Sequence, residues 1–129
     1  MDSIADMLVR INTALKVRKE AADIPYSRMK EGIARIMLAE GFIGKCDVLT
    51  RMNKKYLRLG LKYVDGKKSV IDGLRRISTP GRRSYVGVGS IPRVRAGFGV
   101  AVMSTPRGLM TDEEARAKKV GGEVVCYIW

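Results

Sequence analysis

The sequence predicts an α+β fold, in which a small α/β N-terminal unit, residues 1–65, is packed on a β-rich C-terminal unit, residues 66–129. Two helices and about three strands are expected in the first unit, because its apolar residues recur first with helical and then with alternating spacing. Short strands and one short helix are expected in the second, because its apolar runs are brief and broken by Gly and Pro. A polar, turn-like joint at residues 64–68 separates the two patterns.

The first helix is expected to begin at a cap formed by Ser3. Acidic residues lie near its start and basic residues near its end, as the helix dipole favours. Apolar residues three or four positions apart predict one buried stripe, made of Ile4, Met7, Leu8, Ile11 and Leu15.

The second helix follows an extended piece at residues 22–25, with Ser27 as its cap and Gly41 as its stop. Ile33, Ile36 and Met37 are expected on its buried side. Strands are then predicted at residues 42–49 and 56–63, with a turn near residues 52–54, because leucines alternate with polar or small residues in the second segment.

In the C-terminal unit, the apolar run Val100–Met103 predicts a buried strand, and Thr111 with Glu114 forms the pattern of a capping box. The helix that begins there is expected to stop at Gly121. Residues 104–108 are therefore predicted to form a loop between a strand and a short helix. Two fixed elements would hold its small polar side chains ready for a partner.

The composition indicates a polyanionic partner. The chain has 25 Lys and Arg against 13 Asp and Glu, a formal charge of +12 over 129 residues. Nucleic acid is the favoured polyanion, with an acidic membrane surface as the alternative. No segment approaches the roughly 18 apolar residues of a membrane span, and the N-terminus lacks the order of a signal peptide, so a cytoplasmic protein with no membrane partner is expected.

Arginine is concentrated in one part of the chain. Residues 73–111 contain no Asp, Glu or Lys, and the guanidinium group suits bidentate phosphate contact. Tyr85 follows this charge and could stack on a base, although core packing explains an isolated tyrosine equally well. A solvated basic face is the alternative for the arginines themselves. They are Arg75, Arg76, Arg82, Arg83, Arg93, Arg95 and Arg107.

The predicted loop does not suit a simple phosphate cradle. The first turn of the following helix carries three acidic residues at positions 112–114, which already complement the dipole and would repel phosphate. Ser104, Thr105, Arg107 and Gly108 fit sugar hydroxyls and base edges better, because they combine hydroxyl groups with close backbone approach. The alternative is a loop whose hydroxyls bond only its own backbone.

The chain resembles the S-eight family of small-subunit ribosomal proteins, in its bacterial or organellar form, nearly from end to end. The most specific stretch is Ser104-Thr105-x-Arg107-Gly108-x-Met110-Thr111-Asp112-x-Glu114-Ala115-Arg116, followed by Gly121-Gly122-Glu123-x-x-Cys126. Further matching segments are Ile4-Ala5-Asp6-Met7-Leu8, Glu40-Gly41-Phe42-Ile43, Arg76-Ile77-Ser78-x-Pro80-Gly81-x-Arg83 and Ile91-Pro92-x-Val94.

The resemblance implies direct binding to an irregular stem in the central domain of small-subunit ribosomal RNA, early in assembly, with neighbouring ribosomal proteins as further partners. It leaves open whether this chain also binds its own messenger RNA as a translational repressor, as many bacterial members do. The residues that it implies for RNA contact are Ser104, Thr105, Gly108, Tyr85, Gly122 and Glu123 for recognition, and Arg83, Arg107, Arg28 and Lys30 for backbone anchoring.

The chain departs from the family at two places. Pro106 stands where many relatives have Ser, which removes a hydroxyl and a backbone donor from the loop. The usual Asp-Pro start is Asp2-Ser3, and the segment Val9–Thr13 differs from the usual Thr-Arg-Ile-Arg-Asn.

Other classes of protein fit the sequence less well. Without His, the common catalytic triads are excluded, and the glycine patterns lack the spacing of dinucleotide or phosphate loops, so no enzyme, small-molecule substrate or cofactor is expected. Two cysteines eighty positions apart do not make a metal site and are expected to be buried free thiols. An RNA-recognition motif is disfavoured because two of its aromatics are missing. Nonspecific DNA binding and another structured-RNA module remain the alternatives.

Overall fold

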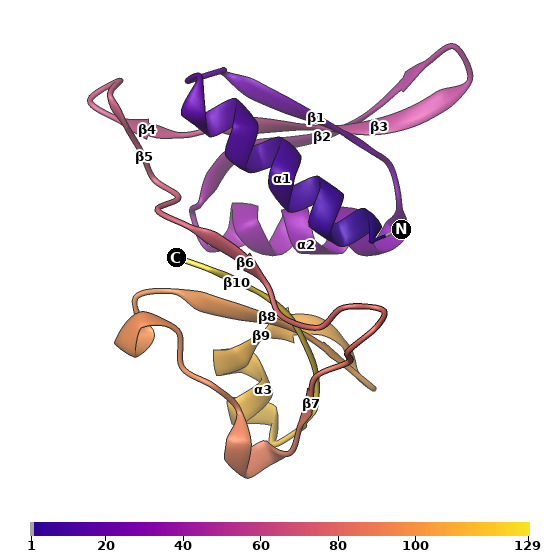
Figure 1. Ribbon diagram of the computed structural model, residues 1–129, viewed down its shortest axis with the longest axis vertical. Coiled ribbons are helices and arrows are strands. Elements are labelled where there is room, and N and C mark those ends of the chain that lie inside the picture. The colour runs from indigo at the N-terminus through magenta and orange to yellow at the C-terminus, as the bar shows by residue number, and fades with distance from the viewer. Residues whose placement is uncertain (1) are drawn as a thin grey trace. The chain divides into compact units, whose positions relative to one another are not determined.

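The computed structural model describes residues 2–129, and the chain divides into two compact units (Figure 1). Unit 1 comprises Ser3–Asp72, and unit 2 comprises Gly73–Trp129 together with Asp2. Helices and antiparallel sheets occur together, which confirms the predicted α+β class. The joint expected at residues 65–66 lies in the turn between β4 (Tyr63–Val64) and β5 (Lys68–Ser69), and residues 66–72 group with unit 1.

Unit 1 is a three-stranded antiparallel sheet with two helices on one face (Figure 1). Its elements are α1 (Ser3–Lys16), β1 (Ala21–Pro25), α2 (Arg28–Ala39), β2 (Ile43–Arg51) and β3 (Lys54–Leu61), and the strand order is β1-β3-β2. Because side chains alternate along a strand, one face of the sheet is buried and the other is open. The buried side chains are Ala22, Ile24, Ile43, Cys46, Leu57 and Leu59.

The first helix differs from its prediction in two details. It begins at Ser3, so Ser3 lies inside the first turn rather than before it. Ala14 is buried in place of Leu15, because the stripe continues three residues after Ile11 rather than four.

The second helix begins and ends as predicted. The Ser27 hydroxyl accepts a hydrogen bond from the Lys30 backbone N–H at 3.1 Å, which caps the N-terminus. At the other end, Gly41 has φ +81°, and the N–H groups of Gly41 and Phe42 bond the carbonyls of Leu38 and Met37. This is a Schellman motif, which satisfies the last carbonyls of the helix.

Unit 2 is a five-stranded antiparallel sheet with one helix. Its elements are β6 (Leu74–Arg76), β7 (Tyr85–Val86), two single 3-10 turns at Val88–Ser90 and Arg95–Gly97, β8 (Val100–Thr105), β9 (Gly108–Thr111), α3 (Asp112–Lys118) and β10 (Gly122–Ile128). The strand order is β6-β10-β8-β9, and β7 also pairs with β10. The core of the unit is formed by Val94, Ala101, Met103, Met110, Ala115 and Val124.

The predicted loop at residues 104–108 is wrong in form. Thr105 pairs with Gly108, so β8 and β9 make a hairpin with the two-residue turn Pro106-Arg107. The capping box of Thr111 and Glu114 is present. However, α3 ends at Lys119, which takes the left-handed conformation with φ +55°, and not at Gly121.

Both cysteines are free and buried. Burial raises the pKa of the Cys126 thiol to about 12. Within residues 2–129, no helix is long and apolar enough to cross a membrane.

Candidate nucleic-acid interface

A row of side chains crosses four strands of unit 2. Glu123 in β10 pairs with Tyr85 in β7 on one side and with Ser104 in β8 on the other. Ser104 in turn pairs with Leu109 in β9. Residues directly opposite in an antiparallel sheet project from the same face. The sheet therefore gathers Tyr85, Glu123 and Ser104, which are far apart in the sequence, into one row.

This row lies on the face of the sheet that points away from the core around α3. Met103 and Val124 belong to that core, and their chain neighbours Ser104 and Glu123 project to the opposite side. Glycine keeps the strands at the required distance, because a Cβ at Gly122 would overlap the carbonyl oxygen of Ser104. Any larger residue at this position would displace the row.

Two members of the row offer polar or aromatic groups to a partner. Tyr85 is 70% exposed, and Ser104 is half-buried near the end of β8. Within residues 2–129, the structure shows no hydrogen bond of the Ser104 hydroxyl to another side chain or to the backbone. These two residues therefore present a stacking surface and an open hydroxyl side by side with Glu123.

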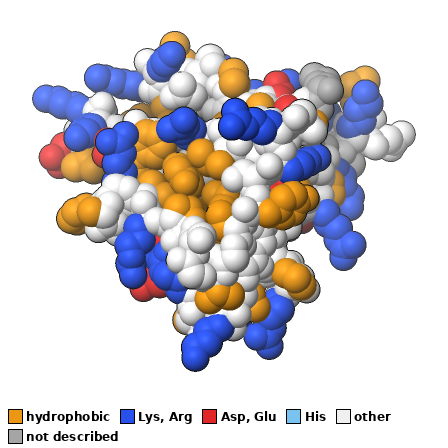
Figure 2. All heavy atoms as spheres, turned by 60° about the horizontal axis from the view of Figure 1, so that its bottom comes forward, with side chains coloured by type: hydrophobic (Ala, Val, Ile, Leu, Met, Phe, Trp, Pro, Cys, Tyr) orange, Lys and Arg blue, Asp and Glu red, His pale blue; other side chains and the backbone are white. Residues whose placement is uncertain are grey.

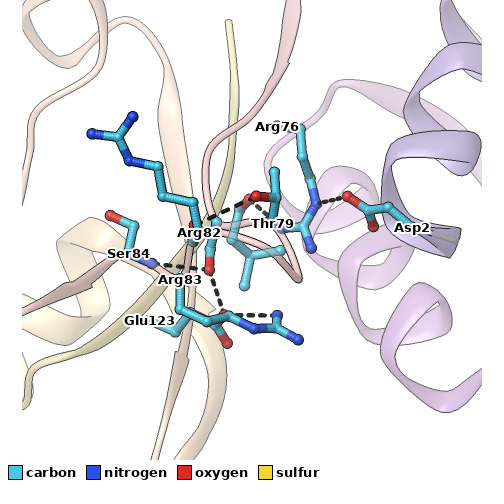
Figure 3. Close-up of polar contacts among 9 residues, drawn as sticks. Asp2, Arg76, Thr79, Arg82, Arg83, Ser84 and Glu123 are labelled. Carbon is cyan, nitrogen blue, oxygen red and sulfur yellow. Dashed lines mark hydrogen bonds and ion pairs between the residues drawn. The ribbon is translucent and has the colours of Figure 1, made fainter.

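The carboxylate of Glu123 is used inside the unit. It accepts a hydrogen bond from the buried Ser78 hydroxyl and forms an ion pair with Arg83 at 3.1 Å (Figure 3). The Ser78 oxygen also accepts from the Ser84 backbone N–H at 3.1 Å. Glu123 therefore holds Arg83 in place through Oε2, and its backbone pairs with strands on both sides.

Next to the row, a shallow groove of about 560 Å³ carries the basic charge. Arg76 on its wall is held by Asp2 at 3.0 Å and donates to the Val125 carbonyl at 2.7 Å, so it is structural. In Figure 3, the Arg82 side chain extends away from Glu123. The groove is lined by Arg75, Arg76, Ile77, Arg82, Arg83, Ser84 and Tyr85.

Arg75 and Arg82 are the free cations of this groove. Both are exposed, and no carboxylate lies within ion-pair distance of either in residues 2–129. Arg83 is exposed as well but shares its charge with Glu123. The groove thus holds the unneutralised Arg82 and the positioned Arg83 near Tyr85, with Arg75 at its edge strand, which suits a phosphate backbone with an accessible base.

The β8–β9 hairpin has a turn that is satisfied internally. The Thr105 hydroxyl donates to the Gly108 carbonyl at 2.8 Å and accepts from the Arg107 backbone N–H at 3.1 Å. Pro106 suits the first turn position, and Gly108 takes φ +107°, which favours glycine. Thr105 therefore shapes the turn, as the alternative interpretation of the loop expected, while the Arg107 side chain is exposed at the tip.

The two basic residues predicted from unit 1 differ in exposure. Arg28, the first residue of α2, is exposed. Lys30 is only 4% exposed, and burial lowers the pKa of its ammonium group. An anchoring role for Lys30 would require its side chain to move outward.

Outside the groove, the remaining arginines of residues 73–111 are divided. Arg93 is exposed, whereas the Arg95 guanidinium lies 4.6 Å from the centroid of the Trp129 ring. The face drawn in Figure 2 shows many Lys and Arg side chains and few acidic ones. The Arg-rich segment therefore makes one basic groove plus scattered contacts rather than one continuous surface.

The family model described as "Ribosomal protein S8" matches residues 2–129. The chain belongs to the ribosomal protein S8 family. The protein named "Small ribosomal subunit protein uS8" in Dictyoglomus turgidum is 51% identical to this chain, over 99% of this chain and 97% of that protein. The proteins of the same name in Caldicellulosiruptor bescii and Thermus thermophilus are each 50% identical to this chain. The match covers 100% of this chain for the first and 99% for the second, and 98% of each relative.

Membership of the ribosomal protein S8 family gives this chain a structural role in the ribosome and not an enzymatic one. In the described part of the chain, no group of three potential metal ligands occurs.

Sequence reasoning missed Ser78 as a site residue, although it lies within one of the segments that carry the resemblance. A buried serine that bonds a distant glutamate leaves no local signal, so only the hydrogen bond in the folded unit identifies it. It also missed Leu109, which completes the cross-strand row.

Proposed function

We propose that this protein is a structural component of the small ribosomal subunit in the cytoplasm, where it binds directly to an irregular stem in the central domain of the ribosomal RNA and promotes assembly. The family assignment supports the ribosomal role. The single observation that carries the RNA contact is the row of Tyr85, Glu123 and Ser104 beside a groove lined by arginines.

Affinity comes from the basic groove. Arg75, Arg82 and Arg83 displace counterions from the sugar-phosphate backbone, and Arg107 at the hairpin tip and Arg28 in unit 1 add further phosphate contacts. This part of the binding free energy depends strongly on salt and carries no sequence information.

Recognition comes from the row and the hairpin. Ser104 offers its hydroxyl to a base edge or a ribose, and Tyr85 stacks on an unpaired base. Gly108 leaves room for close approach of the RNA to the backbone, Gly122 keeps Ser104 close to β10, and Thr105 fixes the shape of the Pro106-Arg107 turn. A regular A-form helix hides its base edges in a deep groove, so these groups need a stem with irregular pairing.

The test is footprinting on small-subunit ribosomal RNA at graded salt. We expect protection at one irregular stem of the central domain, which persists at salt concentrations that abolish protection elsewhere. Protection spread evenly along duplex segments, or equal competition by duplex DNA, would contradict the proposal and favour nonspecific binding.

The same interface is suited to a look-alike stem in the messenger RNA that encodes the protein. As a component of the subunit, the protein also has neighbouring ribosomal proteins as partners. Competition between the messenger and the ribosomal stem for the purified protein tests the first of these. Absence of competition at concentrations that saturate the ribosomal stem would exclude repression through this interface.

A further inference from the structure

The hairpin between β2 and β3 of unit 1 has an unfavourable turn. Met52 and Asn53 form its two-residue tip, and both take the left-handed conformation, with φ +51° and +65°. Such turns favour Asn, Asp or Gly at these positions. Asn53 suits the turn, whereas Met52 does not, and the Met52 side chain is 89% exposed.

Two cations face each other across this tip. Arg51 and Lys54 are directly paired in the antiparallel register, and like charges directly opposite destabilise a sheet. Neither side chain forms an ion pair within the described chain. The carboxylate nearest in the sheet, Asp23, is already bound by Arg58 through bonds of 2.9 and 3.1 Å. Asp23 also attracts Arg51 at longer range, so the repulsion at the tip is relieved only in part inside the protein.

An apolar surface adjoins these cations. A shallow groove of about 570 Å³ runs beside the tip and includes Pro25, Tyr56 and Met52 together with Arg51 and Lys54. Tyr56 and Arg51 lie on the same open face of the sheet, since they alternate with the residues that face the helices. The groove combines these apolar and aromatic side chains with four cations, and its one carboxylate, Asp23, is bound by Arg58.

We propose that this hairpin tip is a second RNA contact, in which Arg51 and Lys54 bind the phosphate backbone and Met52 and Tyr56 lie against the exposed nucleotide. The inference rests on the proposed function and adds a site in unit 1. A polyanion relieves the cross-strand repulsion, which the protein compensates only in part. The apolar part amounts to a few side chains, far short of the roughly 800 Å² per partner of a stable protein interface.

The experiment measures binding of the full-length protein to a transcript of the whole central domain at several salt concentrations. The variant Arg51→Gln/Lys54→Gln removes two cations from the tip. We expect the slope of log affinity against log salt to fall by about two, and the affinity at low salt to fall roughly tenfold or more. The control, Lys67→Gln/Lys68→Gln, removes two exposed cations from the β4–β5 hairpin of the same unit, where Lys68 lies 3.9 Å from Asp72.

A tethered probe separates contact from a general loss of charge. Cys46 and Cys126 are buried, so Thr50→Cys supplies one exposed thiol near the tip for an iron chelate that cleaves nearby RNA. We expect cleavage confined to one RNA segment, with different or no cleavage from Val64→Cys. An unchanged slope, an equal fall in the control, or RNA-independent capture of an acidic protein by the tip with no RNA cleavage would overturn the inference. If wild type itself fails to bind the transcript, the proposed function fails instead.

Discussion

The two long hairpins of this protein end in opposite ways. The β8–β9 turn in unit 2 has a proline where one is favoured, a glycine at φ +107°, and a threonine hydroxyl that bonds the turn on both sides. The β2–β3 turn in unit 1 has two non-glycine residues at positive φ and a pair of opposed cations. The first turn is relaxed and fixed in shape, which suits recognition. The second carries two opposed cations without an ion pair of their own, which suits a polyanion.

Support beneath the two tips differs as well. The β8–β9 hairpin lies beside Glu123, whose carboxylate links Ser78 and Arg83. Beneath the β2–β3 tip, Arg58 bonds Asp23 on the open face of the sheet, where solvent screens the pair. We infer that the Glu123 network fixes the position of Arg83 beside the row of Tyr85 and Ser104, whereas the β2–β3 tip presents exposed charge without such support.

Gly122→Ala is expected to have the largest effect, because it breaks the support of the relaxed hairpin. The added Cβ meets the carbonyl oxygen of Ser104, which the backbone cannot easily move. We expect the free energy of unfolding to fall by about 3 kcal/mol, measured by urea denaturation. Gly87→Ala is the control, since its added Cβ meets nothing within 4 Å. Equal stability of the two variants would contradict close strand approach at this position.

Ser78→Ala is expected to come second. It removes the buried hydroxyl that Glu123 and the Ser84 backbone N–H share, so the stability should fall by about 2 kcal/mol. RNA affinity should also fall under conditions where the variant is fully folded. Glu123, the partner of Arg83, then lacks the hydroxyl that fixes its carboxylate. Chemical denaturation and filter binding measure the two quantities. A variant with the same free energy of unfolding as the wild type would show that the Ser78 hydrogen bonds do not stabilise the unit.

Lys54→Glu sharpens the comparison because it should change stability and binding in opposite directions. An acidic residue opposite Arg51 converts repulsion into attraction, and the protein should become more stable by about 0.5 kcal/mol. Affinity for the central domain should nevertheless fall. Thermal unfolding and a binding titration test both signs, with Lys67→Glu as the control. A variant that loses stability would show that the opposed cations do not destabilise the hairpin.

The smallest effect is expected at acid pH. The hydrogen bond from Arg58 lowers the pKa of Asp23 below its ordinary value of 3.8. A depressed folded pKa adds stability above the unfolded pKa, and this stability is lost as the pH falls through the folded value. Asp23→Asn should therefore be less acid-sensitive than wild type below about pH 4. Parallel stability curves for the two proteins between pH 5 and pH 2 would show that the pair contributes nothing.

Local signals predicted much of the fold. The cap at Ser27, the stop at Gly41 and the capping box at Thr111 and Glu114 depend on residues a few positions apart, and the structure has all of them. The strand β9 was not predictable in this way. Its four residues carry no alternation of their own and form a strand only because β8 pairs with them.

The candidate site shows the same division. The residue types of Tyr85, Ser104 and Glu123 follow from the resemblance to a family, but no sequence pattern places them side by side. Their adjacency results from long-range pairing around β10. The burial of Lys30 and the use of Arg76 inside unit 2 are likewise tertiary effects, since each residue reads locally as an exposed cation.

The most direct test measures two quantities for two variants: the ratio of affinities for the irregular stem and a regular duplex, and the salt slope on the stem. Ser104→Ala should lower the ratio about tenfold and leave the slope unchanged. Arg83→Ala should lower the slope by about one and leave the ratio unchanged. If both variants change the same quantity, recognition and phosphate binding do not depend on different residues, and the proposed division between Ser104 and Arg83 is contradicted.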